Sequence, residues 1–487
     1  MLDNCKKMSQ KIIYERLKEE ILGDWIFALL KTVGDVKMAP TFASRFYFLA
    51  STIIYDCIRC FHPEWELVDM YKELGNFSNF NKTINRNLWI EMCVHQALYI
   101  LYTHLNLPTL HIDLVLDEHS TTYPVIYSHD ISKDTILLSW IQRTQSYLNL
   151  RSNDNSTSAR TFQPPEEYPN KNVYISVKDA QNLKDDLPQP DSWCGLDVDY
   201  DNQSHRQQYL TPQWGDVINP IIDHQTKIEM INKISDIYYP SEEVHAQEIV
   251  DVLNLCEHLT ETHKTIAEFW AGGPGTCTPP GFWMFFSYCC AKTWRTNIDK
   301  QALLYYKMGS GLFEAGIMAW ALKRKHLQER PIQSIRKIRP LQSVKLYNNE
   351  IVDNDVWVPY QESTFVTPPF PDFVSGHSTF SSVGSQILTQ FFGTNIIPTK
   401  MLFDPSIFRI LSPLLNDMDE KCNLCQINIF PKSSAIDATP STGICLSWNT
   451  WDEMAQEAGK SRLYGGIHYE SSNQGGLALG RRIFNAI

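Results

Sequence analysis

Apolar residues recur at helical spacing over the first part of this 487-residue chain. They return every three or four positions, which is the pattern of helices that bury one face. We therefore predict that residues 1–150 form an N-terminal helical region. The runs that carry this prediction are Leu17, Ile21, Ile26, Leu29 and Leu30; Phe46, Leu49, Ile53, Ile54 and Cys57; and residues 88–105.

Residues 151–222 change in character. Asn, Asp, Ser, Pro and Gln dominate this stretch, and no long apolar periodicity is present. Clusters of these residues are typical of loops. The single tryptophans Trp193 and Trp214 favour a segment that packs against the rest of the protein. We predict a loop-rich connector on the surface.

Residues 223–487 return to helical periodicity and are predicted to form a helical catalytic region. One helix is expected to run to about residue 329, because the residue before Pro331 disfavours the helical conformation. A second is expected over 378–392 and a third from about 448 to 458. Residues 341–371 and 400–447 look irregular, and alternation typical of strands is rare. The chain is thus predicted to be all-α, with long irregular connections.

Composition limits the classes of partner. Hydrophobic residues make up 43% of the chain, which is enough for a buried core, and the formal net charge is -12. That charge argues against nucleic acid or an anionic membrane surface as the main partner. The longest apolar stretches, residues 46–58 and 282–291, are too short to span a bilayer as helices. The charged first 20 residues lack a signal-peptide core, so we expect a soluble protein that is cytoplasmic by default.

The 12 cysteines are scattered along the sequence. Two pairs have the CxxC spacing, Cys57 with Cys60 and Cys422 with Cys425. Such pairs can form zinc or redox sites. The first pair lies inside an apolar-periodic run, which favours buried free thiols over metal binding.

Three short segments in the last third of the chain combine basic residues with histidines. The first contains Lys323, Arg330 and Pro331. At about 100° per residue, positions seven apart on one helix differ by only about 20°, so both cations are predicted to reach one pocket. The alternative is a solvated basic face, since Arg324 and Lys325 continue the charge.

The second segment is Ser375-Gly376-His377, directly before a predicted helix. Free amides at a helix N-terminus bind anions, and Gly376 lets the backbone approach a ligand closely. His377 is then placed for acid–base work. The alternative for Ser375 is a simple N-cap. A nucleophilic serine is disfavoured because no GxSxG elbow surrounds it.

The third segment contains Ser461-Arg462, with His468 six positions after the arginine. Gly465 and Gly466 interrupt the helix between them, so a loop can turn both side chains inward. The alternative for His468 is a satisfied core histidine. Together the three segments offer three cations, two imidazoles, a hydroxyl and a glycine amide, a set that suits one tetrahedral or trigonal-bipyramidal oxyanion.

With these residues in order, the chain resembles the vanadium-dependent haloperoxidases, which share their site with acid phosphatases and type 2 phosphatidic acid phosphatases. The family pattern is K-x6-RP, PSGH and SR-x5-H, and Val374 stands where PSGH has proline. Similarity to bacterial-type members extends from about residue 25 to the end of the chain. Further matching segments include 40–45, 210–216, 267–271, 367–381 and 463–467.

This resemblance implies helical bundles around a vanadate cofactor, with phosphate able to take the same site. It implies that His468 is the axial vanadium ligand and that His377 acts in acid–base chemistry. Lys323 would also polarise bound peroxide. Hydrogen peroxide, halide and a small organic substrate are the implied partners. The equatorial oxygens would be held by Lys323, Arg330, Arg462, Ser375 and the Gly376 amide.

Four positions qualify the resemblance. Ser472 stands where relatives commonly have an aspartate four residues after the ligand histidine, and Glu470 or a backbone carbonyl could substitute. Gly272 replaces an aspartate thought to pair with the site arginine. Phe370 resembles chloroperoxidase-type members, where bromoperoxidase-type members have histidine. Trp320 matches a halide-pocket position, with helix core as its alternative.

The resemblance leaves two further functions open. A phosphatase would use the same histidine to form a phosphohistidine, with His377 as the general acid. A non-catalytic relative would keep the fold for anion binding or interaction. The loop-rich middle and the N-terminal helices favour the haloperoxidase.

Overall fold

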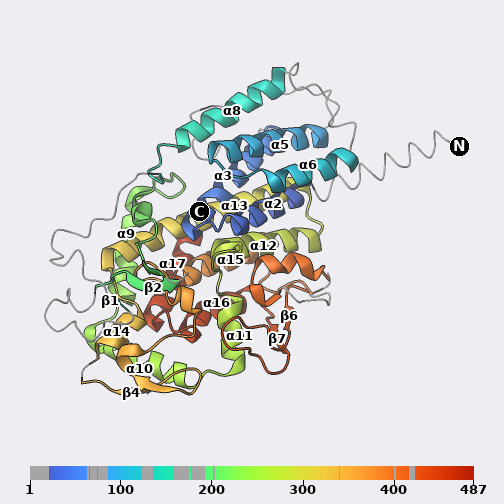
Figure 1. The fold of residues 1–487 in the computed structure, drawn as a ribbon. Helices are drawn as coiled ribbons and strands as arrows, with labels where there is room; N and C mark the ends of the chain where they lie inside the picture. Colours follow the sequence, from blue (N-terminus) through green and yellow to red (C-terminus); the bar gives the residue numbers. More distant parts are fainter. Residues whose placement is uncertain are drawn as a thin grey trace.

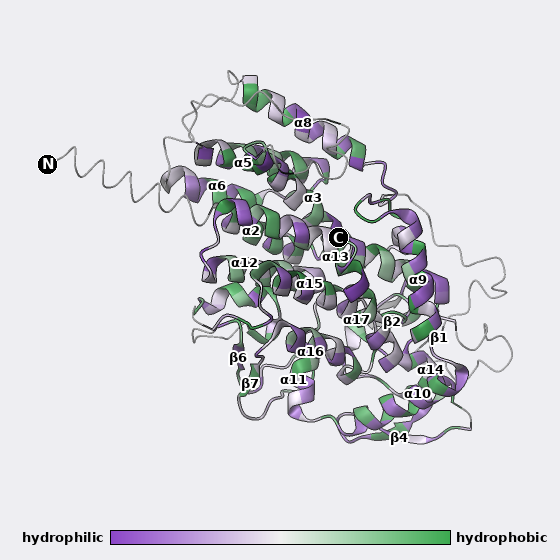
Figure 2. Cartoon of the chain, turned by 180° about the vertical axis from the view of Figure 1, so that it is seen from behind, coloured by the Kyte–Doolittle hydropathy of each residue, from purple (hydrophilic) through white to green (hydrophobic). Residues whose placement is uncertain are grey.

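Helices make up most of the structure, a computed structural model that describes residues 21–62, 65, 74, 86–122, 135–157, 175–176, 192–200, 203–338, 340–399, 402–415 and 423–487. The helices stack in successive layers (Figure 1). This confirms the all-α prediction. Hydrophobic and hydrophilic residues alternate along outer helices such as α8 and α9 (Figure 2), as expected where one face is buried.

The predicted N-terminal helices are present, and Cys57 lies in the hydrophobic core. Leu17 and Cys422 fall outside the described residues. Pro40 opens its helix at the first position, where its missing N–H costs nothing. The helices of this part are α2 (Ile21–Asp35), α3 (Pro40–Arg59), α5 (Arg86–His104), α6 (Leu110–Thr122) and α8 (Thr135–Arg151).

α13 is 29 residues long, is buried along most of its length, and packs against α9, α12, α15 and α17 of the C-terminal part. It packs against α3 on one side and α15 on another, and so joins the two groups of helices. These helices are α9 (His224–Tyr238), α10 (Glu242–Glu257), α11 (Glu261–Phe269), α12 (Thr278–Thr293), α13 (Ile298–His326), α14 (Pro331–Lys337), α15 (Gly376–Phe392), α16 (Trp451–Tyr464) and α17 (Glu470–Phe484).

The expected geometry of Lys323 and Arg330 is wrong, because the two residues do not share a helix. α13 ends at His326, where Leu327 takes the left-handed conformation (φ 49°). Arg330 is extended (φ -82°, ψ 156°), as the steric effect of Pro331 on the preceding residue requires. A short loop therefore brings the guanidinium to the site.

Three small sheets lie in the segments that were expected to be irregular. A three-stranded sheet has the order β1-β2-β3, and the pairs β4-β5 and β6-β7 are antiparallel. Trp214 of the connector is fully buried, and Trp193 packs against the core. The division into three regions stays a prediction. The strands are β1 (Ile175–Ser176), β2 (Leu196–Tyr200), β3 (Gln203–Arg206), β4 (Ser343–Lys345), β5 (Ile351–Asp353), β6 (Gln426–Ile429) and β7 (Ile444–Ser447).

No helix that the structure describes is both long and apolar enough to cross a bilayer.

Glycines let α15 and α17 approach closely at the end of α15 that carries the Ser375 segment. A Cβ at Gly476 would lie 2.6 Å from the carbonyl oxygen of Ser375 and 2.8 Å from Cβ of Ser378. A Cβ at Gly480 would lie 2.5 Å from Cβ of Ser382. No flexible side chain can yield at these contacts, so only glycine permits the observed packing.

We predict that Gly476→Ala destabilises the protein by about 1–3 kcal/mol, because the added methyl group forces the two helices apart. Urea unfolding would measure this loss. Gly443→Ala is the matched control, since its added Cβ would meet its nearest atom at 3.4 Å. Equal stability of the two variants would contradict the proposed role of this close packing.

Candidate functional site

A cavity of about 260 Å³ lies where the three motif segments meet. It is called here the larger cavity, because a second one of about 130 Å³ adjoins it. The larger cavity is the structural counterpart of the expected oxyanion site. Residues far apart in the sequence form its wall, from the start of α15, the end of α16, the loop before α17, and α13. The candidate residues in this wall are Gly376, His377, Arg462, His468, Trp320 and Phe370.

Ser375 caps α15 and fixes the position of the two residues after it. Its Oγ accepts a hydrogen bond from Ser378 N at 3.3 Å. The N-cap interpretation is therefore confirmed, yet the hydroxyl keeps its own hydrogen for a second partner. The backbone N–H of Ser375 donates to the carbonyl of Ser472 at 3.0 Å, which ties the start of α15 to α17.

His468 is held at both ring nitrogens. Gly466 (φ 66°) turns the chain after α16, and His468 follows in the loop before α17. Its Nδ1 lies 2.7 Å from Oδ1 of Asp372, and its Nε2 lies 3.0 Å from Nη1 of Arg330. Because arginine can only donate, Nε2 must accept and Nδ1 must carry the hydrogen. Arg330 thus occupies the Nε2 lone pair in this structure, and a ligand on Nε2 would replace that hydrogen bond.

Asp372 supplies the orientation that sequence reasoning assigned to other residues. Glu470 hydrogen-bonds Asn473 and Gln474 instead of His468. Ser472 contributes directly, because its Oγ donates to the carbonyl of Asp372 at 3.0 Å and lies 3.1 Å from Nδ1 of His468. The sequence signal that could have identified Asp372 is its place three residues before Ser375, in the same motif.

Arg330 lies outside the cavity wall and contacts two residues that form it, Phe370 and Ile467. It is fully buried, its Nε donates to Phe370 O at 2.8 Å, and its Nη1 donates to Ile467 O at 2.7 Å. Asp372 lies 3.5 Å from Nη1. Nη2 of Arg330 has no partner among the described residues. Burial lowers the pKa of Arg330 to about 10, despite Asp372.

Lys323 is fully buried and is not part of the cavity wall. Its Nζ donates to Pro371 O at 2.8 Å and to Asp372 O at 2.9 Å. Burial and the neighbouring Arg330 lower the pKa of Lys323 well below its usual value. The surface-charge alternative for Lys323 is therefore excluded, and its observed contacts hold the segment that carries Asp372.

Arg462 lines the larger cavity without a carboxylate partner among the described residues. Its Nη1 donates to Ala267 O at 3.3 Å, and its Nε has no partner there. Gly272, at the position of the missing aspartate, is in the left-handed conformation (φ 58°). Burial, followed by repulsion from Arg330, lowers the pKa of Arg462 to about 9.

His377 also lines this cavity as a neutral imidazole. Its Nε2 donates to the carbonyl of Trp270 at 2.9 Å, which leaves Nδ1 as the acceptor. Burial lowers the pKa of His377 well below its usual value, and the charges of Arg462 and His468 add to this effect. The neutral ring keeps an acceptor at Nδ1, and the neighbouring cation lowers its basicity.

The two aromatic residues singled out from the sequence, Trp320 and Phe370, also line the cavity. Trp320 and Phe370 lie at 4.9 Å between centroids, and Trp320 Nε1 donates to Leu210 O at 2.9 Å. Lys323 Nζ and Arg330 Cζ each lie 5.0 Å from the centre of the Phe370 ring. The face of Phe370 thus helps to stabilise both buried cations. Trp320 is buried and also lines the cavity, so its place in the helix core is confirmed and its role in a halide pocket stays a prediction.

The group that fits this arrangement is an oxyanion. Arg462 lines the cavity, Lys323 and Arg330 are buried behind its wall, and the Asp372 carboxylate lies 3.5 Å from Nη1 of Arg330. Buried positive charge without counter-charge is costly, and it favours binding of an anion. The unpartnered Arg330 Nη2 and Arg462 Nε are buried donors that an anion's oxygens would satisfy.

We predict that Asp372→Ala lowers the affinity for vanadate or phosphate about 10- to 100-fold, as is usual when a residue that orients a ligand histidine is lost. Isothermal titration calorimetry would measure the change. Glu470→Gln is the matched control, because Glu470 does not contact His468, and it should bind as the wild type does. A larger loss of affinity in Glu470→Gln than in Asp372→Ala would show that Glu470 orients the histidine.

Comparison with known proteins supports the fold. Residues 303–487 match the model of the VCPO second helical-bundle domain. No curated protein matches the chain. Solved structures that share its fold include a holo-type bacterial vanadium-dependent chloroperoxidase (TM-score 0.64, 12% identity, 92% of each chain). A bacterial vanadium-dependent iodoperoxidase (0.64, 19%, 96% of each) and an apo-type bacterial vanadium-dependent chloroperoxidase (0.65, 13%, 92% of this chain and 95% of that one) are also similar.

Proposed function

Because this chain is of the vanadium haloperoxidase type in its fold and in residues 303–487, we propose that its larger cavity binds vanadate and that the protein oxidises halide with hydrogen peroxide. The observation that carries this proposal is the group of three buried cations in and behind the cavity wall, with Asp372 as a nearby carboxylate that lies 3.5 Å from Arg330. His468 lines the same cavity, and because its Nδ1 faces Asp372, Nε2 is the nitrogen that could bind a ligand in place of Arg330. Such a set matches an oxyanion that also takes one nitrogen ligand.

Vanadate, when bound, would supply Lewis acidity that activates peroxide. His468 would be the ligand through Nε2, since Asp372 occupies its Nδ1–H. Arg330, Arg462, the Ser375 hydroxyl and the Gly376 amide would hold oxygens by charge-assisted hydrogen bonds. Ser375, Arg330 and Lys323 lie outside the cavity wall in this structure, so their direct contact with an anion is part of the proposal.

His377 would act as the base that accepts a proton from hydrogen peroxide. Its neutral Nδ1 can accept a proton from hydrogen peroxide that enters the cavity, and the Trp270 carbonyl holds the ring by the opposite nitrogen. Arg462 beside it raises the acidity of the incoming peroxide. Lys323 would act mainly by holding the segment that carries Asp372 in place, because its Nζ donates to the carbonyls of Pro371 and Asp372.

Halide would enter beside Trp320 and Phe370. The two rings form an apolar wall of the cavity, and the cations behind Phe370 give that wall a positive potential. A weakly hydrated anion is suited to such a surface. Phe370 is the residue from which a chloroperoxidase-type preference would follow.

We expect the purified chain to bind vanadate and to oxidise bromide in the presence of hydrogen peroxide. His468→Ala should lower the rate at least 100-fold, because the nitrogen ligand is lost. His224→Ala is the matched control, since His224 is exposed and lies outside the cavity wall. Absence of halide oxidation with saturating vanadate would contradict the proposal.

A phosphatase is the second candidate, and the paired neutral imidazoles on one cavity favour it. The Nε2 of His468 could attack a phosphoryl group, with His377 in the role of general acid after protonation. Burst release from an aryl phosphate, without halide oxidation, would establish this activity instead. A chain that binds phosphate or vanadate but carries out neither reaction would be a non-catalytic relative.

A further inference from the structure

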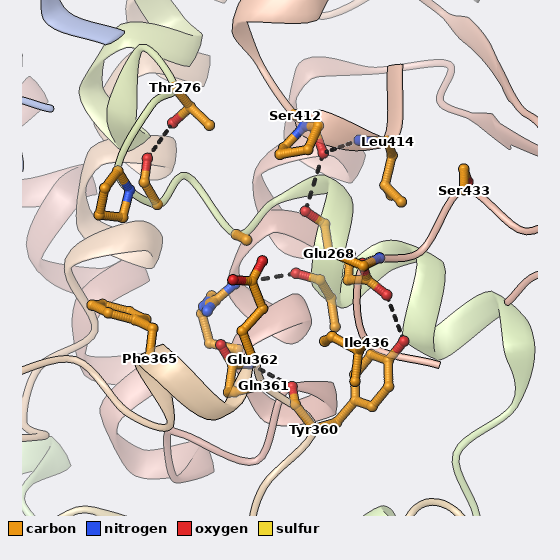
Figure 3. Close-up of a pocket in the computed structure, with 17 residues that line it drawn as sticks. Glu268, Thr276, Tyr360, Gln361, Glu362, Phe365, Ser412, Leu414, Ser433 and Ile436 are labelled. Atoms are coloured by element: carbon orange, nitrogen blue, oxygen red, sulfur yellow. Dashed lines mark hydrogen bonds between the residues drawn. The ribbon is translucent and has the colours of Figure 1, made fainter. Parts of the chain in front are cut away.

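A second cavity, of about 130 Å³, adjoins the larger one and is called here the smaller cavity. The two share part of their walls, so a molecule in one lies close to a molecule in the other. Figure 3 shows the smaller cavity, with Phe365 on one side of the view and Leu414 and Ser433 on the other. The shared wall consists of Ala271, Gly273, Pro274, Phe365 and Arg462.

Arg462 gives the smaller cavity a buried cation. Its side chain is 2% exposed, and its Nε has no partner among the described residues. Gly272 leaves it without the carboxylate that relatives are thought to provide. A guanidinium carries five N–H donors in a plane, so one arginine can bind acceptors on two sides. An oxygen acceptor in the smaller cavity can therefore bind Arg462 while an oxyanion occupies the larger one.

Two acidic residues, Glu268 and Glu362, also line the smaller cavity, and Glu362 is exposed to solvent. Oε1 of Glu268 accepts from Tyr360 at 2.5 Å and from Ser434 at 2.5 Å, and its Oε2 accepts from Ala435 N at 3.1 Å. Burial also raises the pKa of Glu268. The hydrogen bonds of Glu268 hold the loop at 434–435, and Glu362 is exposed, so Arg462 is the buried charge of this wall that keeps an unpartnered donor.

The remaining wall is mainly apolar and has the size of one ring. Pro274, Phe365, Leu414 and Ile436 contribute to it. An engineered protein cavity of about 150 Å³ holds benzene. A flat six-membered ring therefore matches the volume, and Phe365 offers it an aromatic neighbour. Ser433 Oγ, which also has no partner among the described residues, is a further polar contact.

We propose that the smaller cavity binds a single-ring phenol, with the phenol oxygen on the Arg462 guanidinium and the ring against the apolar wall. This inference rests on the proposed function, for which it names the organic substrate class. The hypohalous acid formed in the larger cavity would halogenate the ring. A carbon–halogen bond forms, the oxygen–halogen bond breaks, and the ring proton leaves with hydroxide as water; the carbon is oxidised by two electrons and the halogen is reduced.

The placement beside Arg462 suits this chemistry. A cation at the oxygen stabilises the phenolate, which is richer in electrons and reacts faster with an electrophile. The shared wall keeps the path between the two cavities short. A bound phenol would thus capture the oxidant before it diffuses into water.

The test begins with phenol binding to the vanadate-free protein, measured by calorimetry and by NMR contacts between phenol and the Ile436 methyl groups. Ile436→Trp fills the smaller cavity and should weaken phenol binding at least tenfold. It should leave bromide oxidation without phenol unchanged, because Ile436 does not line the larger cavity. Ile351→Trp is the matched control, since Ile351 is 72% exposed and lines neither cavity. Benzylamine, a ring with a cation, should bind more weakly than phenol.

The outcomes separate this inference from the proposed function. Halide oxidation with no phenol binding, or with binding that Ile436→Trp leaves unaltered, would overturn the inference alone. Tighter binding of benzylamine than of phenol would also overturn it, because Arg462 would then not direct the ligand. Phenol contacts with Ile436 in a protein without halide oxidation would support the binding site and defeat the proposed function. If Ile436→Trp does not fold, the NMR contacts in the wild type decide the question.

Discussion

Buried positive charge that exceeds its counter-charge is the constraint on which this structure depends. Lys323, Arg330 and Arg462 are each withdrawn from water, and the Asp372 carboxylate lies 3.5 Å from Arg330. Burial lowers the pKa of all three cations and of the two cavity histidines, His377 and His468. The folded protein therefore stores an unfavourable electrostatic energy that an oxyanion in the larger cavity would relieve.

Asp372 contacts most of the charged and titratable groups around the larger cavity. Its Oδ1 faces Nδ1 of His468, its carbonyl accepts from both Lys323 and Ser472, and Arg330 lies beside it. Burial raises the pKa of Asp372 to about 6, while the two cations act in the opposite direction. One carboxylate thus sets the tautomer of the histidine and also compensates part of the neighbouring charge.

The two departures from the family pattern have different consequences. The change at Ser472 is compensated, because Asp372 and the serine hydroxyl both face the imidazole. The change at Gly272 is not compensated among the described residues, and Arg462 keeps an unpartnered donor. A relative that pairs this arginine with aspartate would commit it to one cavity. Here Arg462 lies on the wall of two cavities, so its guanidinium can donate hydrogen bonds in both of them.

The sequence by itself determined the helices and the identity of the chemical groups, because both depend on local patterns. Apolar periodicity marked α3 and α15, and the three motifs named the residues that line or support the larger cavity. Tertiary structure decided how those groups meet. Leu327 ends α13 early, so Arg330 arrives by a loop, and Asp372 reaches His468 across 96 positions of sequence only through the packing of α17 on α15. Contacts between distant segments follow from packing and leave no periodic signal, which is why the contact of Asp372 with His468 and the smaller cavity could not be found from the sequence.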